Sequence, residues 1–368
     1  MPGPLHRLGE SLAARRAALA AAVLAAGLAL TAAATGFAYR QFQDAAADDL
    51  RNRAAPLDAV LRERLGQYEA LLRAGQGFFR SHESGSHPID PADWRQFVES
   101  LGVGRSYPGM HRLTHVSFVP GDRLDAFVAE QSRDSGAPLT VDPPGRRDIH
   151  CVVTHLAPLM PNLQTYGIDL CTRPHLRELL LSAADSGAMT ASGRVAIETL
   201  GIESGLLLFY PVYQGAALPA EAAERRGRLS GWIASAVDLR ELLSVRDPGL
   251  SVRLLRERDG AEPEQLHAYG APPADALEFV DPIPVGVGRW QLVAAVPRPV
   301  PWPAIGAGGA GAALSLMLAA LVYTLGRTQA RARLLATEMT AALRVRERAL
   351  AASANGVVIS DAVRPDQP

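Results

Sequence analysis

Residues 17–39, AALAAAVLAAGLALTAAATGFAY, decide the architecture of this chain, because all 23 of them are uncharged. As an α-helix this stretch is about 34 Å long, enough to cross the hydrocarbon layer of a membrane, which is about 30 Å thick. The alternative is a cleaved signal peptide, since Ala32 and Ala34 offer an A-x-A site. The apolar region of a signal peptide is usually shorter, about 7–15 residues, so we predict an uncleaved transmembrane helix.

A second uncharged stretch covers residues 299–326, and we predict a second transmembrane helix over 303–326. Gly306, Gly308, Gly309 and Gly311 lie near its start. Small residues at such spacing let two helices approach closely in lipid, which would suit a homodimer. The same glycines are equally explained by the high alanine and glycine content of the chain.

The charges beside these stretches predict which side of the membrane each segment faces. Residues 1–16 carry three arginines, and residues 327–348 carry six. Because arginine is enriched in cytoplasmic flanks, both ends are expected in the cytoplasm and residues 40–299 outside it, across the inner membrane of a cell. The chain has 37 basic and 38 acidic residues, a net charge of −1, which argues against a dedicated nucleic-acid binder.

The outer segment begins with a helical pattern and continues as a mixture of strands and helices. A stalk helix is predicted over 42–80, bent at Pro56, with one apolar stripe: Leu50, Leu57, Leu61, Leu65, Tyr68 and Leu72. A second helix is predicted from Asp90-Pro91, where Asp90 caps the first turn. Strands are predicted at 113–119, 149–155, 206–213, 229–237, 250–255 and 291–296, and helices at 123–132 and 174–184, the latter capped by Thr172.

This order predicts an α+β fold with antiparallel sheets. Stretches rich in proline, glycine and polar residues at 214–228 and 258–274 are interpreted as loops. The first loop would divide a distal lobe, about 82–215, from a proximal lobe, about 228–297.

Six short motifs, in this order and spacing, resemble the CHASE domain, the extracytoplasmic input module of bacterial receptors and plant cytokinin receptors. They are Tyr107-Pro108-Gly109, Val119-Pro120, Ala157-Pro158-Leu159, Gly167-Ile168-Asp169-Leu170, Asp185-Ser186-Gly187 and LLLFYPVY at 206–213. The resemblance covers about residues 60–260 and implies a long stalk helix with two PAS-like lobes between two transmembrane helices. One departure is Ser117-Phe118, where many relatives have a tryptophan nearby.

The resemblance also implies a binding site for a small, heteroaromatic ligand. Asp169 matches the aspartate that accepts hydrogen bonds from the ligand ring, Ser186 takes the place of a threonine that supports the pocket, and Thr190 and Ala191 fall on the next strand. The alternative for Asp169 is a structural carboxylate that bonds the loop before the helix. Tyr210 and Tyr213 belong to a strand of which one face should line the pocket; the alternation of side chains leaves open which one.

No catalytic, metal or cofactor motif is found. The segment 201–205 has glycines and a serine in the wrong register for a nucleophile elbow, and phosphate-loop and H-E-x-x-H patterns are absent. Cys151 and His155 would lie about 13 Å apart along a strand, too far to share one ion. Cys171 could pair with Cys151 in a disulfide, or both could be buried thiols.

The C-terminal segment is interpreted as an intracellular connection. Residues 327–348 have a weak heptad pattern typical of a signalling helix, and residues 349–368 resemble the first helix and strand of a truncated PAS domain. The resemblance implies an output domain beyond this chain, either a histidine kinase of a two-component system or a cyclic-di-GMP synthase or phosphodiesterase. We therefore predict a membrane sensor without enzymatic activity in this chain; the alternatives are a membrane-tethered periplasmic enzyme and a protein-binding assembly factor.

Overall fold

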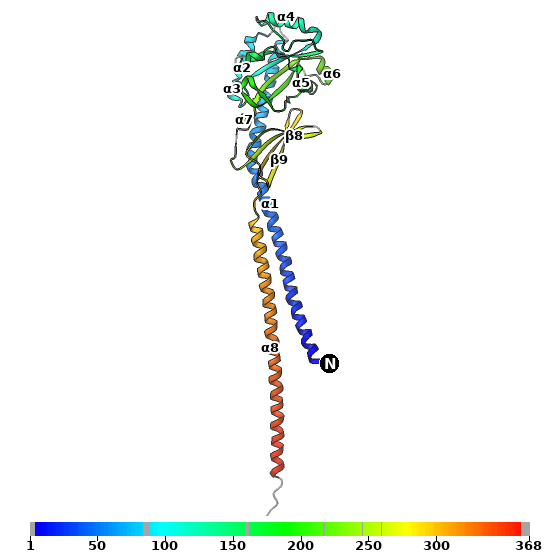
Figure 1. Ribbon diagram of the computed structural model, residues 1–368, viewed down its shortest axis with the longest axis vertical. Coiled ribbons are helices and arrows are strands. Elements are labelled where there is room, and N and C mark those ends of the chain that lie inside the picture. The colour runs from blue at the N-terminus through cyan, green and yellow to red at the C-terminus, as the bar shows by residue number, and fades with distance from the viewer. Residues whose placement is uncertain are drawn as a thin grey trace, which may run out of the picture. The chain divides into compact units, whose positions relative to one another are not determined.

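The computed structural model describes residues 4–83, 89–158, 162–215, 218–244, 246–258 and 260–361. It has an α+β fold, as predicted, and two compact units: residues 1–46 with 300–368, and residues 47–299. Helix α1 (Pro4–Glu83) begins the chain and helix α8 (Trp302–Asp361) ends the described part (Figure 1). Two antiparallel sheets lie between them in sequence.

The part of α1 that belongs to the second unit forms the centre of its core. All six apolar positions of the predicted stripe are buried, and the helix continues through Pro56. Each such side chain contributes about 1.5–3 kcal/mol when removed from water. Polar contacts fix the helix along its length: Arg53 pairs with Asp247 at 3.0 Å, and Gln76 donates to the Pro211 carbonyl at 2.7 Å.

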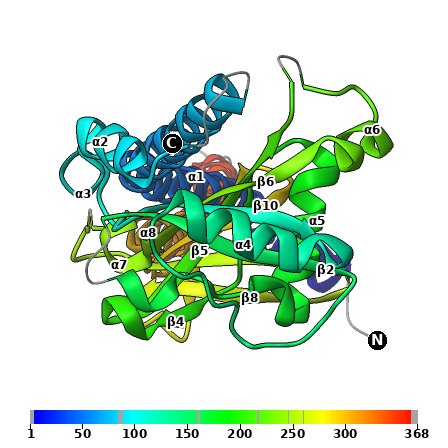
Figure 2. The same cartoon turned by 90° about the horizontal axis from the view of Figure 1, so that it is seen from above.

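The first sheet has the strand order β2-β1-β6-β5-β3, with β4 paired to β5. The strands are β1 (Leu113–Pro120), β2 (Ile149–Ala157), β3 (Thr190–Ala191), β4 (Val195–Ile197), β5 (Ile202–Tyr213) and β6 (Leu229–Asp238). Because side chains alternate along β5, Leu208 and Tyr210 share a core with α1 and α2 (Pro91–Leu101). Phe209 packs on the opposite face with α5 (Pro174–Ser186), and Figure 2 shows these helices around the sheet.

The second sheet has the order β8-β7-β10-β9 and packs against the same segment of α1. Its strands are β7 (Ser251–Arg258), β8 (Ala261–Tyr269), β9 (Ala276–Val285) and β10 (Gly288–Pro297). The loop predicted at 258–274 is wrong, since it contains β8. Both β8 and β9 are edge strands, where charged residues and prolines are tolerated, and Pro282 and Pro284 lie within β9.

Shorter elements complete this unit. They are α3 (Val103–Ser106), η1 (Gly121–Arg123), α4 (Leu124–Asp134), η2 (Asn162–Thr165), η3 (Leu170–Thr172), η4 (Glu198–Leu200), α6 (Ala222–Gly227) and α7 (Leu239–Leu242). Helix α6 lies inside the stretch 214–228 that was predicted to be a loop. The chain then returns to the first sheet through β6, so the second sheet begins only after α7.

Two of the predicted caps can be checked. Asp90 caps α2, accepting a hydrogen bond from the Ala92 backbone at 2.7 Å. Thr172 does not cap α5, because the helix begins at Pro174 and its N-cap residue is Arg173, which makes no side-chain capping bond. The Thr172 hydroxyl donates instead to the Asp169 carbonyl at 2.7 Å.

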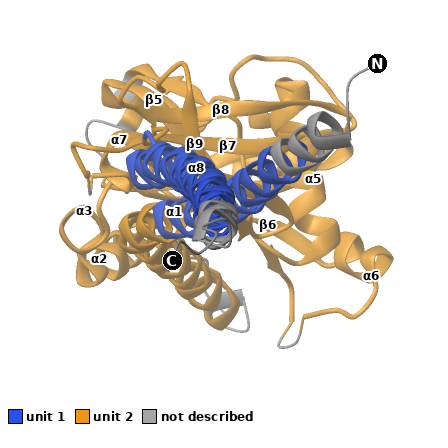
Figure 3. Cartoon of the chain, turned by 90° about the horizontal axis from the view of Figure 1, so that it is seen from below, with its two compact units in different colours: residues 1–46, 300–368 blue, residues 47–299 orange. Residues whose placement is uncertain are grey.

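Two helices are long and apolar enough to cross a membrane, Ala14–Ser81 and Trp302–Ala351. The first unit, coloured separately in Figure 3, contains residues 14–46 of the first and the whole of the second. Nearly all of the most apolar part of each helix is exposed. Glycines bring α1 and α8 into contact: a Cβ on Gly311 would lie 2.6 Å from Thr31 Cγ2. A Cβ added at Gly306 or Gly309 would meet no atom of another segment within 4 Å among the described residues.

Helix α8 continues to Asp361, where the resemblance to a PAS domain implied a first strand. A strand without a partner leaves its backbone groups unpaired, whereas a helix pairs them within the segment. Residues 362–368 of this expected PAS start lie outside the described residues.

Two buried histidines lie between α1 and the first sheet. Phe79 of α1 stacks on His115 with ring centroids 3.9 Å apart, and His155 meets the same phenylalanine edge-on. Burial lowers the pKa of His155 to about 4 and that of His115 well below its usual value. Both imidazoles are therefore neutral in the folded protein at neutral pH.

We expect the full chain in detergent to lose stability as the pH falls from about 6.5 to about 4. Between these pH values His155 is protonated in the unfolded chain but stays neutral in the folded protein. Acid therefore favours the unfolded state, which binds the additional proton. The shift corresponds to about 3 kcal/mol for His155. The melting temperature should fall less steeply with decreasing pH in His155→Gln than in the wild type. In the exposed control His175→Gln the slope should equal that of the wild type. Equal slopes in the wild type and both variants would contradict a lowered pKa of His155.

Candidate functional site

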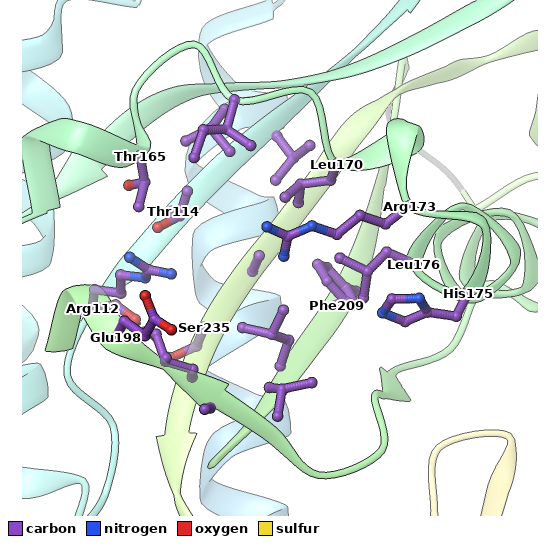
Figure 4. A pocket seen from close by; sticks show the side chains of 18 residues that line it. Arg112, Thr114, Thr165, Leu170, Arg173, His175, Leu176, Glu198, Phe209 and Ser235 are labelled. Carbon is purple, nitrogen blue, oxygen red and sulfur yellow. Dashed lines mark hydrogen bonds between the residues drawn. The ribbon is translucent and has the colours of Figure 1, made fainter. Parts of the chain in front are cut away.

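A cavity of about 330 Å³ lies on the face of the first sheet that α5 covers. Its floor comes from the strands β1, β2, β5 and β6, one wall from η3 and α5, and the other wall from β4 and η4 (Figure 4). The apolar lining consists of Val116, Val153, Ile168, Leu170, Leu176, Val195, Ala196, Ile197, Leu207, Phe209 and Ala234. The polar lining consists of Arg112, Thr114, Thr165, Arg173, His175, Glu198 and Ser235.

One end of the cavity is polar. Figure 4 shows Arg112, Thr114, Thr165, Glu198 and Ser235 gathered there. The Ser235 hydroxyl donates to the Arg112 carbonyl at 2.6 Å, whereas the buried Thr114 hydroxyl has no hydrogen-bond partner. Burial lowers the pKa of Arg112 to about 10, so its guanidinium stays charged at neutral pH at a cost in desolvation.

Three polar side chains of the cavity lining are exposed to solvent. Arg173, His175 and Glu198 line it and are exposed. Within the described part of the chain, the side chains of Arg173 and Glu198 take part in no hydrogen bond or ion pair. Arg173 and His175 lie on the α5 side of the cavity, whereas Glu198 lies at the polar end beside Arg112 (Figure 4).

Asp169 is completely buried and its carboxylate is saturated by protein groups. Its Oδ1 accepts hydrogen bonds from the backbone of Cys151 at 2.9 Å and of Cys171 at 3.0 Å. Its Oδ2 lies 2.8 Å from His150 Nδ1 and 3.3 Å from Arg147 Nη1. Its neighbours Ile168 and Leu170 line the cavity, but Asp169 does not. These contacts match the structural alternative, a carboxylate that fixes the loop before α5.

The other predicted ligand-binding residues also lie away from the cavity wall. Ser186 donates to the carbonyl of Ser182 in the last turn of α5, and Thr190 donates to that of Leu179 at 3.3 Å. Ala191 pairs with Leu208 at the sheet edge.

The two tyrosines of β5 point to opposite faces. Tyr213 shares the face of Phe209 and donates to the Ala184 carbonyl at 2.6 Å, whereas Tyr210 faces α1 and stacks with Arg73. Of these three aromatic residues only Phe209 lines the cavity. The side of β5 that faces the cavity is therefore the Phe209 side.

Cys151 and Cys171 are joined by a disulfide with a Cα separation of 5.2 Å. The bond ties β2 to η3 beside Asp169, so the wall that carries Ile168 and Leu170 is held to the sheet. Cys151, Asp169 and Cys171 are close enough to resemble a metal site. The sulfurs bond each other and the carboxylate is saturated, so this group is not available to an ion.

Sequence reasoning missed the polar residues of the cavity. The alternation along residues 113–119 could have placed Thr114 and Val116 on one face, because residues two apart on a strand share a face. Arg112, Arg173 and Glu198 come from three separate segments, and no local pattern connects them.

Residues 189–198, here called the strap, connect the cavity to the second sheet. Val195 to Glu198 form one cavity wall. The other end of the strap bonds the second sheet: the Met189 carbonyl accepts from Val287 N at 3.2 Å, and Glu264 accepts from Arg194 N at 2.9 Å. Arg256 adds a bond to the Ala191 carbonyl at 3.3 Å.

Residues 87–267 match the family model of the CHASE domain. The matched segment contains every residue that lines the cavity and the whole strap. CHASE domains are extracytoplasmic sensory modules of membrane receptors. No curated protein matches the chain.

Proposed function

Because this chain is a CHASE-domain sensor, we propose that it is an inner-membrane receptor whose outer segment, residues 40–299, binds a small molecule in the cavity beneath α5. The observation that carries the proposal is the cavity itself, which lies within the matched segment and combines an apolar floor with a few polar groups. Its volume falls at the lower end of the range for small-molecule sites, about 300–1,000 Å³. The disulfide supports an oxidising, extracytoplasmic location.

The membrane arrangement follows from the sequence. Two spans, 17–39 and 303–326, place residues 1–16 and 327–348 in the cytoplasm, where arginine is enriched. The first sheet with α5 serves as the distal PAS-like lobe and the second sheet as the proximal one. A second copy of the chain packs on the α8 surface that bears Gly306 and Gly309, and the output domain beyond residue 368 is a histidine kinase or a cyclic-di-GMP enzyme.

The strap supplies a route from the cavity toward the membrane. A ligand changes the signalling equilibrium only if it binds one conformation better than the other. A shift of the wall formed by Val195 to Glu198 would be passed through the bonds of Met189 and Arg194 to the second sheet. The last strand of that sheet, β10, leads directly into α8.

A thermal-shift screen of the full chain in detergent tests the function. We expect at least one small metabolite from a library of adenine derivatives and organic acids to raise the melting temperature, since a ligand that binds only the folded state stabilises it by mass action. The variant Ala196→Trp, which obstructs an exposed part of the cavity wall, should lose this response. The control Ala271→Trp adds the same ring at an exposed site away from the cavity and should keep it.

The two rivals predict other outcomes. A scaffold for protein assembly gives no shift with any small molecule. A tethered enzyme converts the compound that stabilises it, which chromatography of the incubated compound would reveal. An equal rise in melting temperature in Ala196→Trp and in the wild type would show that the ligand binds outside this cavity.

A further inference from the structure

Three potential metal ligands lie outside the cavity, where the loop before β1 meets the end of β6 and the start of α7. A ring nitrogen of His111 and one carboxylate oxygen each from Asp238 and Glu241 lie within 4.8 Å of one another. One imidazole and two carboxylates are donors of the kinds that Zn²⁺ takes, and the imidazole favours Zn²⁺ over Mg²⁺ or Ca²⁺. We propose that these three side chains bind a Zn²⁺ ion, independently of any ligand in the cavity.

His111 supplies an indication beyond proximity. Its Nε2 is buried and has no hydrogen-bond partner in the described part of the chain. Buried polar atoms are usually paired, and the nitrogen of a neutral imidazole that carries no proton has a lone pair that a metal ion can bind. The residue is held in place by its backbone: its N–H donates to the Ala236 carbonyl at 3.4 Å, and the preceding Met110 pairs with Val237 of β6.

Both carboxylates are oriented by backbone amides. Glu241 Oε2 accepts a hydrogen bond from Gly109 N at 2.7 Å, and Asp238 Oδ1 accepts one from Arg240 N at 2.8 Å. Such hydrogen bonds orient the ligands of a metal ion and fix their geometry. Within the described residues Glu241 Oε1 takes part in no hydrogen bond or ion pair, so it is available to an ion.

Arg240 shares the buried Asp238 carboxylate with the proposed ion. Its Nη2 lies 3.3 Å from Oδ2 and its Nε lies 3.4 Å from Oδ1, and both distances are long for charge-assisted hydrogen bonds. The Arg240 side chain is 48% exposed, so it can turn toward solvent or toward Glu203, which is 4.0 Å away. Zn²⁺ carries twice the charge of this guanidinium and would contact both carboxylates.

An ion at this position would fasten the junction between the two sheets. It would join the loop at 107–111 to α7, which lies against β8 of the second sheet. Helix α1 is already attached there, because Arg64 donates to the Leu242 carbonyl at 2.8 Å. We therefore expect Zn²⁺ to stabilise the folded outer segment as a whole.

Calorimetry on the full chain in detergent, purified without a histidine tag and stripped of metal with EDTA, tests the site. Zn²⁺, Mn²⁺, Mg²⁺ and Ca²⁺ are titrated separately, and Co²⁺ reports its ligands through its visible absorption. We expect one Zn²⁺ per chain, bound at least about tenfold more tightly than Mn²⁺. At a free concentration of about 100 Kd, Zn²⁺ should raise the melting temperature by about 5–10 °C.

Glu241→Gln tests the site with little risk to the fold, because Glu241 is exposed and glutamine keeps an oxygen for the Gly109 amide. This variant and His111→Ala should each weaken Zn²⁺ at least about a hundredfold, since losing even an outer partner of a metal ligand weakens binding by about 10–100-fold. The matched controls are Glu130→Gln in α4 and His175→Ala in α5, both at exposed positions. They should bind Zn²⁺ as the wild type does.

Arg240→Gln gives a change in the opposite direction. It removes the cation that shares Asp238, so Zn²⁺ should bind several-fold more tightly than in the wild type. Asp238 itself is left unaltered, because it also caps α7. Weaker or equal Zn²⁺ binding in Arg240→Gln would contradict the assignment of Asp238 as a ligand.

The remaining outcomes each contradict the site. If the folded wild type binds no Zn²⁺, the three side chains only anchor the loop before β1. If Glu241→Gln and His111→Ala keep the wild-type affinity, the ion binds other surface groups adventitiously. If Mg²⁺ or Ca²⁺ binds more tightly than Zn²⁺, His111 is not a ligand. The response of the cavity to small molecules is a separate measurement and stands or falls without the ion.

Discussion

Replacing Asp169 by alanine is expected to lower the free energy of unfolding by about 3–5 kcal/mol, the range for removing one partner of a buried ionic network. The carboxylate is completely buried and accepts from the backbone of Cys151 and Cys171, and its second oxygen faces His150 at 2.8 Å. Alanine would leave these donors without an acceptor in the interior, where each unpaired group is costly. Chemical denaturation of the full chain in detergent measures the loss.

Asp148→Ala is the matched control. This carboxylate is exposed and forms an ion pair with Arg177 at 2.5 Å, and exposed pairs contribute little to stability. An Asp169→Ala protein as stable as the control, but unable to respond to ligand, would contradict the structural role. It would return Asp169 to the ligand-contacting role that the family resemblance implies.

The sequence was most informative where apolar residues repeat over a long segment. The stalk stripe from Leu50 to Leu72 is buried as predicted, and β1, β5 and β6 were recognised because their runs of apolar residues are characteristic of central strands. The strands that were missed lie at edges or are very short. β3 has two residues, and β8 alternates Glu262 and Glu264 with small or apolar residues, so neither has the pattern of a buried strand.

The cavity could not be predicted in the same way, because its polar residues meet only through tertiary packing. Arg112 precedes β1, whereas Glu198 follows β4, and their meeting depends on the order of strands in the sheet. Likewise, the alternation of side chains along β5 predicts two faces but does not indicate which one lines the cavity. Only the packing of α5 against Phe209 distinguishes the cavity face from the face that meets α1.

Gly286 lies in the turn between β9 and β10, where this turn contacts the strap and leaves no room for a side chain. It has a φ of 56°, in the left-handed region that favours glycine, and an added Cβ would lie 1.7 Å from the Met189 carbonyl oxygen of the strap. Gly286→Val should therefore push the β9–β10 turn away from the strap and break the bond from Val287 N to Met189 O. We expect a loss of about 2–4 kcal/mol in stability, from backbone strain and the lost contact together.

Gly260→Val separates these two causes. Gly260 has a φ of 68° but nothing within 4 Å of an added Cβ, so valine there introduces backbone strain alone, about 1–3 kcal/mol. Hydrogen exchange adds a local readout: the amide of Val287 should exchange faster in Gly286→Val and at the wild-type rate in Gly260→Val. Gly286→Val leaves the cavity walls unchanged, so this variant should still bind ligand. Ligand binding should, however, no longer change the hydrogen exchange of β10. Ligand-induced protection of β10 that survives this substitution would remove the strap from the signalling route.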